Sequence, residues 1–491
     1  MGYTSGVEHY DLILIGSSFA SSFFLAAYLP TAPAAARVLV LERGPNRPHS
    51  WQLQNGRTSD VNIDDTYVRQ SDPAVKTWNF TIAHGGASNC WWAVTPRLLP
   101  NDFRMQSVYG VGRDWPISYD DLVPHYETAE RLMAVSGPDE TPFPRTGPYP
   151  QPAHRLSDAD KMLQAAFPGR YFAQPTARAR QKTDHRPACC ATGTCTICPV
   201  NAKFTILNEM AGLYADPRVT LLTGATAEAI ETTGGVASGV VYRRDGATET
   251  ARGDLIGLGA NALFNPYLLL RSGFDHPLLG RRLHDQVALG SVIDLDGVDN
   301  YNGSTSITGH GYMLYDGDHR RERAACLIES LNTAHAARLP FGLPALRNVR
   351  GRHRQRMVLK FIFEDLPNEE NRVMLGDDPA RPVVVHGPRS DYARRSMDAL
   401  PGLLDELFRG LPVEEVRLDP TPTANEGHIL GTTVMGDDPA TSVIDRHLIH
   451  HTVRNLVVLG SGAFPTGSPA NPTLTLAALS LWAAEHLFGR S

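Results

Sequence analysis

The chain has 491 residues, more than a single hydrophobic core usually serves, so two or three domains are expected. With 42% hydrophobic and 20% charged residues, its composition is that of an ordinary globular protein, which excludes a disordered or fibrous chain. The formal net charge of −6 gives no reason to expect binding to nucleic acid or to an anionic membrane.

The first predicted elements form a dinucleotide-binding unit. Residues 10–15 are a short, β-rich apolar run, typical of a buried parallel strand. A turn at Gly16 leads into residues 23–29, whose apolar spacing suits a helix, and residues 37–42 predict a second strand. The helix N-terminus would offer free N–H groups to a pyrophosphate, and Glu42 at the strand end would accept hydrogen bonds from ribose hydroxyls.

This dinucleotide fingerprint departs from its usual form at two positions. Ser18 and Ser21 stand where the second and third glycines usually occur. Serine is small enough for a close approach, but the turn taken alone leaves an ordinary βαβ unit as an alternative.

Four of the six cysteines, Cys189, Cys190, Cys195 and Cys198, fall within ten residues. Four thiolates at this spacing, followed by Pro199, can hold an iron–sulfur cluster. Zinc is an alternative, although the adjacent pair Cys189 and Cys190 would strain a tetrahedral site. The run could also form a disulfide, which a cytosolic setting disfavours, or carry free thiols in a loop.

Residues 347–356 carry Arg or His at six of ten positions. We expect a solvated basic loop here, with docking of an acidic partner as the alternative.

Two runs near the C-terminus each contain one residue suited to alcohol chemistry. They are His428-Ile-Leu-Gly-Thr-Thr-Val-Met-Gly436 and Phe464-Pro-Thr-Gly-Ser-Pro-Ala-Asn471-Pro-Thr-Leu-Thr475. A neutral imidazole can take the proton of a hydroxyl at working pH, and an amide can hold the oxygen without changing the charge.

Six segments resemble the glucose–methanol–choline (GMC) oxidoreductases, in the order of that family. They are the turn at Gly16, Gly85-Gly-Ala-Ser-Asn-Cys-Trp-Trp92 with Thr95-Pro-Arg97, residues 115–130, residues 261–285, residues 366–373 and the C-terminal runs. The resemblance is nearest to the pyranose 2-oxidases and membrane-linked sugar dehydrogenases. It implies oxidation of an alcohol to a carbonyl, with His428 as the base and Asn471 as the group that orients the hydroxyl.

The resemblance also implies FAD as the cofactor, held by three separate segments. The implied cofactor-binding residues are Gly16, Ser18, Phe19, Ala20, Glu42, Arg43, Gly85, Gly86, Ser88, Asn89, Cys90, Trp91, Gly460, Ser461, Asn471, Pro472 and Thr473. A helix over residues 473–488, opened by Pro472, would place its N-terminal amides near the flavin pyrimidine ring. Several sugar-oxidising relatives carry His at the position of Cys90, in some bonded to the flavin; non-covalent FAD is favoured here, with a thioether as the alternative.

In this family the flavin domain is discontinuous, and the order of the motifs implies the same for this chain. The expected fold is α/β, with a Rossmann-like FAD-binding domain from residues 1–100, 191–290 and 425–491. Residues 101–190 and 291–424 would form an α+β substrate-binding domain with an antiparallel sheet.

The expected substrate is a sugar, glycoside or polyol, with an aminoglycoside-type biosynthetic alcohol as the alternative. A non-catalytic electron-transfer flavoprotein would have no need of His428 and Asn471. The electron acceptor would be dioxygen or a redox partner subunit, and sugar dehydrogenases with a similar cysteine run use an iron–sulfur cluster to relay electrons to such a partner. Because Gly16 and four serines interrupt the first apolar stretch, residues 11–29, neither a signal peptide nor a membrane span is expected. The chain is predicted to be cytoplasmic, with export by a partner subunit as the alternative.

Overall fold

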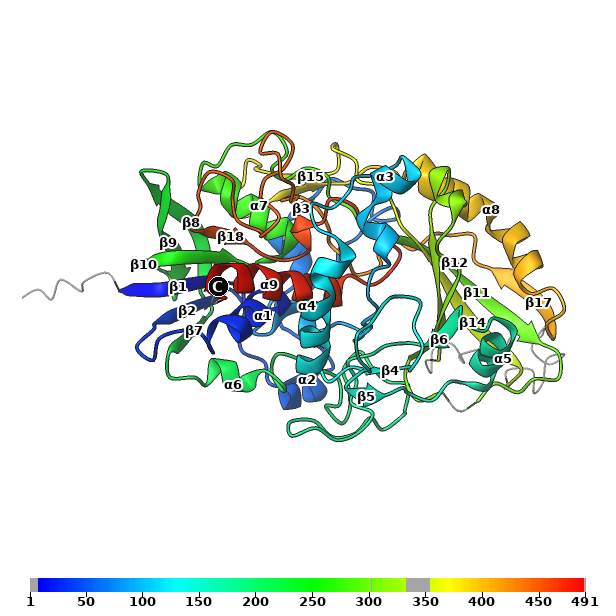
Figure 1. The fold of residues 1–491 in the computed structure, drawn as a ribbon. Coiled ribbons are helices and arrows are strands. Elements are labelled where there is room, and N and C mark those ends of the chain that lie inside the picture. Colours follow the sequence, from blue (N-terminus) through cyan, green and yellow to red (C-terminus); the bar gives the residue numbers. More distant parts are fainter. Residues whose placement is uncertain (1–7, 302, 333–353, 490–491) are drawn as a thin grey trace, which may run out of the picture.

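The computed structural model describes residues 8–301, 303–332 and 354–489. Most of the basic run at 347–356 therefore lies outside the described residues. Two large β-sheets stand at opposite ends of an elongated molecule, with helices and loops between them (Figure 1). No helix in the described ranges is long and apolar enough to span a membrane.

The first sheet has seven strands, and its centre is parallel. The order is β7-β2-β1-β10-β9-β8, with β18 also paired to β10. The strands β7, β2, β1, β10 and β18 run parallel, whereas β8 and β9 extend the sheet as antiparallel strands. The strand bounds are β1 His9–Ile15, β2 Val38–Glu42, β7 Val219–Thr223, β8 Thr226–Thr233, β9 Val236–Arg244, β10 Ala247–Leu258 and β18 Leu456–Val458.

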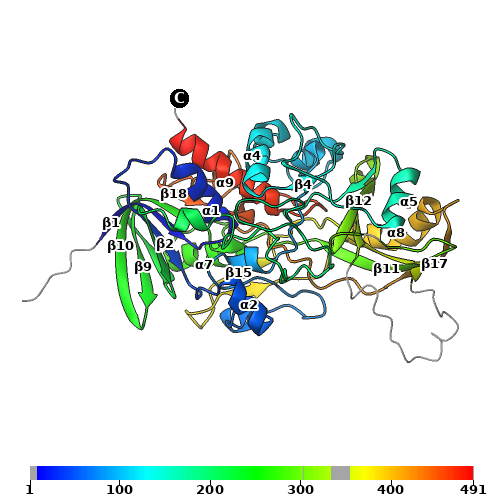
Figure 2. The same cartoon turned by 90° about the horizontal axis from the view of Figure 1, so that it is seen from below.

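The apolar runs of β1 and β2 are buried because helices cover this sheet. All five residues of β2 are buried, as a central parallel strand requires. Helix α1 (Phe19–Tyr28) packs against α9 (Thr473–Phe488), and α7 (Asn261–Arg271) contacts β8. Figure 2 shows α1 and α9 side by side over the sheet. The predicted strand–turn–helix–strand unit is confirmed, and α9 has the predicted bounds.

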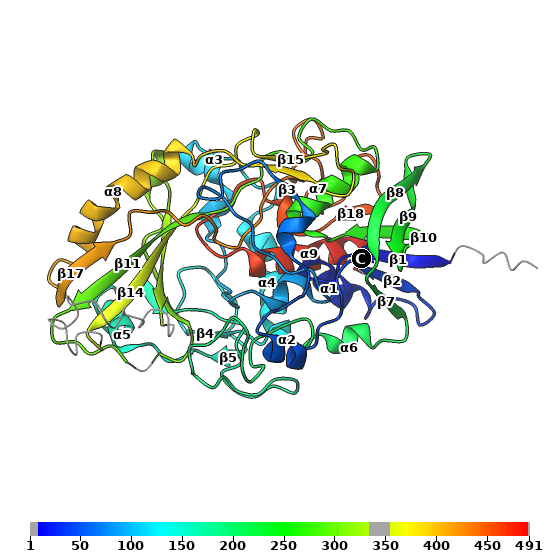
Figure 3. The same cartoon turned by 180° about the vertical axis from the view of Figure 1, so that it is seen from behind.

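The second sheet is antiparallel and has six strands in the order β17-β11-β14-β13-β12-β6. Its outer face packs on α8 and α5, where Leu359 and Phe361 of the sheet join Tyr392, Leu400 and Leu404 of α8 in one core (Figure 3). The bounds are β6 Tyr171–Ala173, β11 Val287–Leu295, β12 Ile307–Leu314, β13 Cys326–Leu331, β14 Arg356–Phe363, β17 Val413–Leu418, α5 Asp158–Ala166 and α8 Asp391–Leu407.

Helix α4 (Tyr119–Leu132) lies in the middle of the molecule, between the two large sheets (Figure 1). Ser118 and Asp121 form a capping box at its N-terminus. The helix packs against α9, and the Tyr126 hydroxyl lies 2.8 Å from Thr475 Oγ1. The fold class predicted from the sequence, a Rossmann-like domain with an antiparallel-sheet domain, is confirmed.

The remaining helices and strands are short. They are α2 His49–Asn55, α3 Met105–Tyr109, α6 Ala211–Tyr214, β3 Val68–Arg69, β4 Ser136–Gly137, β5 Gln151–Pro152, β15 Arg372–Met374 and β16 Val383–Val385.

Candidate active site

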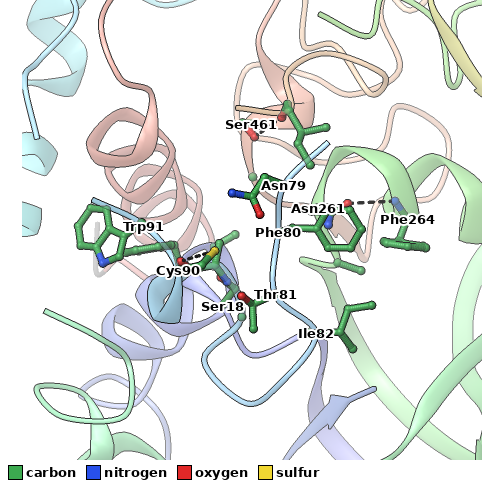
Figure 4. Close-up of a pocket in the computed structure, with 18 of the residues that line it drawn as sticks. Ser18, Asn79, Phe80, Thr81, Ile82, Cys90, Trp91, Asn261, Phe264 and Ser461 are labelled. Atoms are coloured by element: carbon green, nitrogen blue, oxygen red, sulfur yellow. Dashed lines mark hydrogen bonds between the residues drawn. The ribbon is translucent and has the colours of Figure 1, made fainter. Parts of the chain in front are cut away.

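A cavity of about 650 Å³ extends from the Gly16 turn of the first sheet to the inner face of the second sheet. This size is within the range of small-molecule and cofactor sites. In Figure 4, residues 79–82 lie between Ser18, Cys90 and Trp91 on one side and Asn261 and Phe264 on the other. The predicted residues that line the cavity are Gly16, Ser18, Phe19, Ala20, Glu42, Arg43, Gly86, Cys90, Trp91, His428, Gly460, Ser461, Asn471, Pro472 and Thr473.

Three predicted cofactor residues, Gly85, Ser88 and Asn89, do not line this cavity. Gly85 precedes the short 3-10 turn η2 (Gly86–Asn89), and Ser88 and Asn89 belong to it. Ser88 Oγ donates to the Gly85 carbonyl at 2.7 Å, and Asn89 Nδ2 donates to the carbonyls of His84 and Gly86. Their side chains hold the turn, because these bonds orient the backbone that carries Gly86 and Cys90 to the cavity.

The two serines that replace glycines in the fingerprint are accommodated by glycines elsewhere in the chain. A Cβ added at Gly86 would lie 2.6 Å from Ser18 Cβ, and one added at Gly259 would lie 2.3 Å from Ser21 Oγ. Gly16 itself has a φ of +93° and faces the Gly259 carbonyl. The close packing that the fingerprint glycines usually allow is therefore achieved from the opposite side.

The N-terminus of α1 is open toward the cavity. Within the described residues, no side chain caps this helix, and its first turn carries no acid. The unpaired N–H groups and the positive end of the helix dipole fit a pyrophosphate.

Glu42 lies at the end of β2, where a ribose would be expected. Its Oε2 accepts from Ser17 Oγ at 2.7 Å, and its Oε1 accepts from the Gly44 N–H at 2.7 Å. Burial raises the pKa of this carboxyl, while these donors act in the opposite direction. Each carboxylate oxygen can accept more than one bond, so Glu42 still fits the ribose hydroxyls of an adenine dinucleotide.

His428 lines the cavity, and its hydrogen bonding defines which ring nitrogen is free. Gln286 Nε2 donates to the carbonyls of Ser468 at 2.7 Å and Ala470 at 2.9 Å. Gln286 Oε1 is therefore the acceptor in the hydrogen bond between Gln286 and His428 Nδ1. The proton of neutral His428 is thus on Nδ1, which leaves Nε2 as the lone pair available to a substrate.

Burial lowers the pKa of His428 to about 4, although Asp285 and Glu329 act against this shift. Asp285 Oδ1 lies 3.8 Å from His428 Nδ1, and Asp285 is itself paired with the buried Lys76. The imidazole is therefore neutral at neutral pH, the state that a general base requires.

Asn471 precedes α9 and lines the same cavity as His428. Its buried Oδ1 has no hydrogen-bond partner among the described residues, so the amide retains capacity for a ligand. Helix α9 begins directly afterwards, also without a side-chain cap in the described structure. A second helix N-terminus thus reaches the same cavity, consistent with a flavin ring that gains negative charge.

Sequence reasoning missed part of the cavity wall. Residues 79–82, Asn261 and Phe264 also line it. The Arg43 guanidinium stacks on the Phe264 ring, with its carbon 4.6 Å from the ring centroid. The apolar run Trp78–Ile82 directly before the Gly85-Gly86 turn was the signal that could have indicated the first of these. Glu329, Lys360 and Gln286 carry no local motif, because strand pairing and loop packing bring them to the site.

The four clustered cysteines lie beside the loop that contains Asn89 and Trp91. Lys203 Nζ donates to the carbonyls of Asn89, Trp91 and Thr196, and so joins that loop to the cysteine segment. All six cysteines are free thiols, so a disulfide is not found. In the part of the chain that the structure describes, no group of three or more His, Cys, Asp or Glu side chains is placed to hold a metal ion.

Four features together are typical of a dinucleotide-dependent oxidoreductase. They are a parallel sheet, an open helix N-terminus, a buried acid at the end of the second strand, and a neutral histidine that lines the same cavity as an amide with an unpaired oxygen. The GMC oxidoreductase family model matches residues 367–480. The chain is 28% identical to the fructose dehydrogenase large subunit of Gluconobacter japonicus, over 97% of each chain. It is 28% identical to the 6'''-hydroxyparomomycin C oxidase of Streptomyces lividus, over 82% of this chain and 78% of that one.

Solved structures show the same fold. Pyridoxine 4-oxidase from Mesorbium loti has a TM-score of 0.66 at 18% identity, covering 98% of this chain and 100% of that one. A formate oxidase variant from Aspergillus oryzae RIB40 has a TM-score of 0.67 at 13% identity and covers 98% of each chain. The resemblance to the GMC oxidoreductases that the sequence motifs predicted is confirmed, and that family implies FAD as the cofactor.

Proposed function

We propose that this enzyme oxidises a hydroxyl group of a sugar, glycoside or polyol to a carbonyl. The observation that carries the proposal is the neutral His428, which Gln286 fixes through Nδ1 and which lines one cavity with the unpaired Oδ1 of Asn471. An electron-transfer flavoprotein without catalysis would not need this pair.

When bound, FAD accepts a hydride from the carbon of the substrate. The residues that would hold it are those of the Gly16 turn, Glu42, the η2 turn and the start of α9. His428 Nε2 takes the hydroxyl proton, and the Asn471 amide holds the substrate oxygen in place. Both residues are partly buried in the cavity wall, so the surrounding side chains limit their contact with bulk water.

The substrate class is supported by the names of the relatives. These include a fructose dehydrogenase, a 6'''-hydroxyparomomycin C oxidase and a paromamine 6'-oxidase from Streptomyces fradiae. The second candidate, an aminoglycoside-type biosynthetic alcohol, is favoured by the last two, each of which matches more than four fifths of this chain.

The proposed function is tested with purified, FAD-loaded enzyme under anaerobic conditions. D-Fructose, D-glucose, methyl glycosides, sugar alcohols and paromamine are added in turn, and the visible flavin absorbance is followed. We expect at least one member of this panel to bleach the flavin band and to yield a carbonyl product. Failure of the whole panel, with dithionite still able to bleach the band, would contradict the proposed substrate class.

For the electron acceptor, we propose that Cys189, Cys190, Cys195 and Cys198 bind an iron–sulfur cluster that serves a partner subunit. Four thiols suit this group chemically. The described arrangement is not itself a metal site, so residues 189–198 would have to close around the iron.

The cysteine proposal predicts iron and sulfide in enzyme purified without oxygen. Cys195→Ser should lose both and turn over more slowly with artificial one-electron acceptors, because one thiolate ligand is missing. Reduction of the flavin by substrate should persist, which separates this effect from general damage. Cys326→Ser is a matched control, because Cys326 is buried in the second sheet away from the run. Wild-type enzyme without iron or sulfide would overturn the proposal and leave dioxygen as the expected acceptor.

A further inference from the structure

One row of residues crosses the inner face of the second sheet and meets the cavity. Glu329 on β13 is directly opposite Lys360 on β14 and His310 on β12, so the three side chains share a face. Gly290 on β11 is opposite Lys360, and a Cβ placed there would meet no described heavy atom within 4 Å. Glu329, Lys360 and Gly290 all line the cavity, and the glycine leaves open space beside the charges.

The charges of this row do not balance. Lys360 Nζ lies 2.5 Å from Glu426 Oε2, and Glu426 also lines the cavity. Glu329 is 3% exposed, and the one described side chain that donates to it is His310, whose Nε2 lies 3.3 Å from Oε1. Two cavity-lining carboxylates thus share one lysine at this end, and the other partner of Glu329, His310, is a cation only when it is protonated.

Glu329 is held in its charged form. Burial raises the pKa of its carboxyl, but the hydrogen bond from His310 and the nearby Lys360 lower it further, so the overall shift is downward. A buried carboxylate without a matching cation is unfavourable unless a ligand supplies the charge. A substrate hydroxyl could donate a hydrogen bond to Glu329. A protonated amine could donate a hydrogen bond and also bring a positive charge next to the carboxylate.

From this arrangement we infer that Glu329 is a specificity-determining residue and that the preferred substrate carries a protonated amino group, which Glu329 binds. The inference rests on the proposed function, because it takes the cavity as a site for a hydroxylated substrate. Leu331 and Ile307, paired on the same face and also lining the cavity, would contact the C–H face of such a molecule. An anionic substrate would be repelled by Glu329.

The test compares matched probes on FAD-loaded enzyme. The probes are 2-amino-2-deoxy-D-glucose, 6-amino-6-deoxy-D-glucose and paromamine as amines, with D-glucose as the neutral parent. Binding is measured by calorimetry, and flavin reduction is measured separately. We expect at least one amine to bind wild-type enzyme more tightly than D-glucose. Glu329→Gln should weaken that binding about 10- to 100-fold, since a charged hydrogen bond is lost, and should change D-glucose binding less than about threefold.

Two controls separate recognition from folding. Glu415→Gln makes the same chemical change at an exposed position of β17 in the same sheet, and it should leave both affinities unchanged. If Glu329→Gln loses FAD or unfolds, Glu329→Asp keeps the charge and should retain the preference for the amine at reduced affinity.

The binding and reduction readouts distinguish two failures. If wild-type enzyme binds no amine more tightly than D-glucose, or if Glu329→Gln weakens amine and neutral probes equally, the amine inference is wrong. If amines bind through Glu329 but no probe bleaches the flavin, the inference stands and the proposed oxidation of such sugars is wrong.

Discussion

His428→Ala is expected to slow reduction of the flavin by substrate about 10²- to 10⁴-fold, the usual effect of losing a positioned base. The hydroxyl would then lose the acceptor that Gln286 orients, because Nε2 is the lone pair that this hydrogen bond leaves free. FAD should remain bound, since the helix N-termini and Glu42 that would hold it are unchanged. Anaerobic stopped-flow absorbance measures the rate, and the spectrum of denatured protein measures the FAD content.

Asn471→Ala is the matched comparison for His428→Ala. It removes an orienting amide and no proton acceptor, so its rate should fall less than that of the histidine variant. A His428→Ala enzyme that reduces its flavin at the wild-type rate would place the base elsewhere.

The pH dependence gives an independent check on the same residue. Because burial lowers the pKa of His428 to about 4, the neutral base persists well below the ordinary value for histidine. The rate of flavin reduction should therefore stay level as pH falls through 6.5 and decline only toward pH 4. A decline centred near 6.5 would show that this imidazole is solvated in the working enzyme.

The sequence alone predicted the local elements whose residues follow a strong pattern. The β1–α1–β2 unit and the bounds of α9 follow from apolar runs, a glycine turn and Pro472, all of which act over a few residues. His428 and Asn471 were found because each stands in a distinctive run, and the structure brings both to one cavity although 43 positions separate them in the chain. The domain boundaries remain a prediction.

Long-range packing determined what the sequence could not show. The absence of fingerprint glycines at 18 and 21 looked like a weakness, but Gly86 and Gly259 provide the space from segments far along the chain. Ser88 and Asn89 matched a motif, yet their side chains hold the turn and do not line the cavity. Glu329 depends on strand register, and register between distant strands is not readable from either strand alone.

Gln286→Leu is expected to slow flavin reduction about 10- to 100-fold, the kinetic equivalent of losing the hydrogen bond that orients the base. Leucine keeps the bulk of the side chain but cannot accept from His428 Nδ1, so the ring loses both its fixed tautomer and its orientation. The carbonyls of Ser468 and Ala470 also lose their donor next to Asn471. Rapid-reaction kinetics should therefore show a slower reduction, while the affinity for FAD is retained.

Gln286→Glu separates orientation from loss of packing. A carboxylate can still accept from Nδ1, so the tautomer is kept, but its negative charge favours the protonated imidazole and raises the pKa of His428. The decline in rate on acidification should then move upward from pH 4, which a purely structural defect would not produce. If Gln286→Leu reduces its flavin as fast as wild type while His428→Ala is slow, the ring is oriented by other contacts. Asp285, 3.8 Å from Nδ1, would then be the residue to replace.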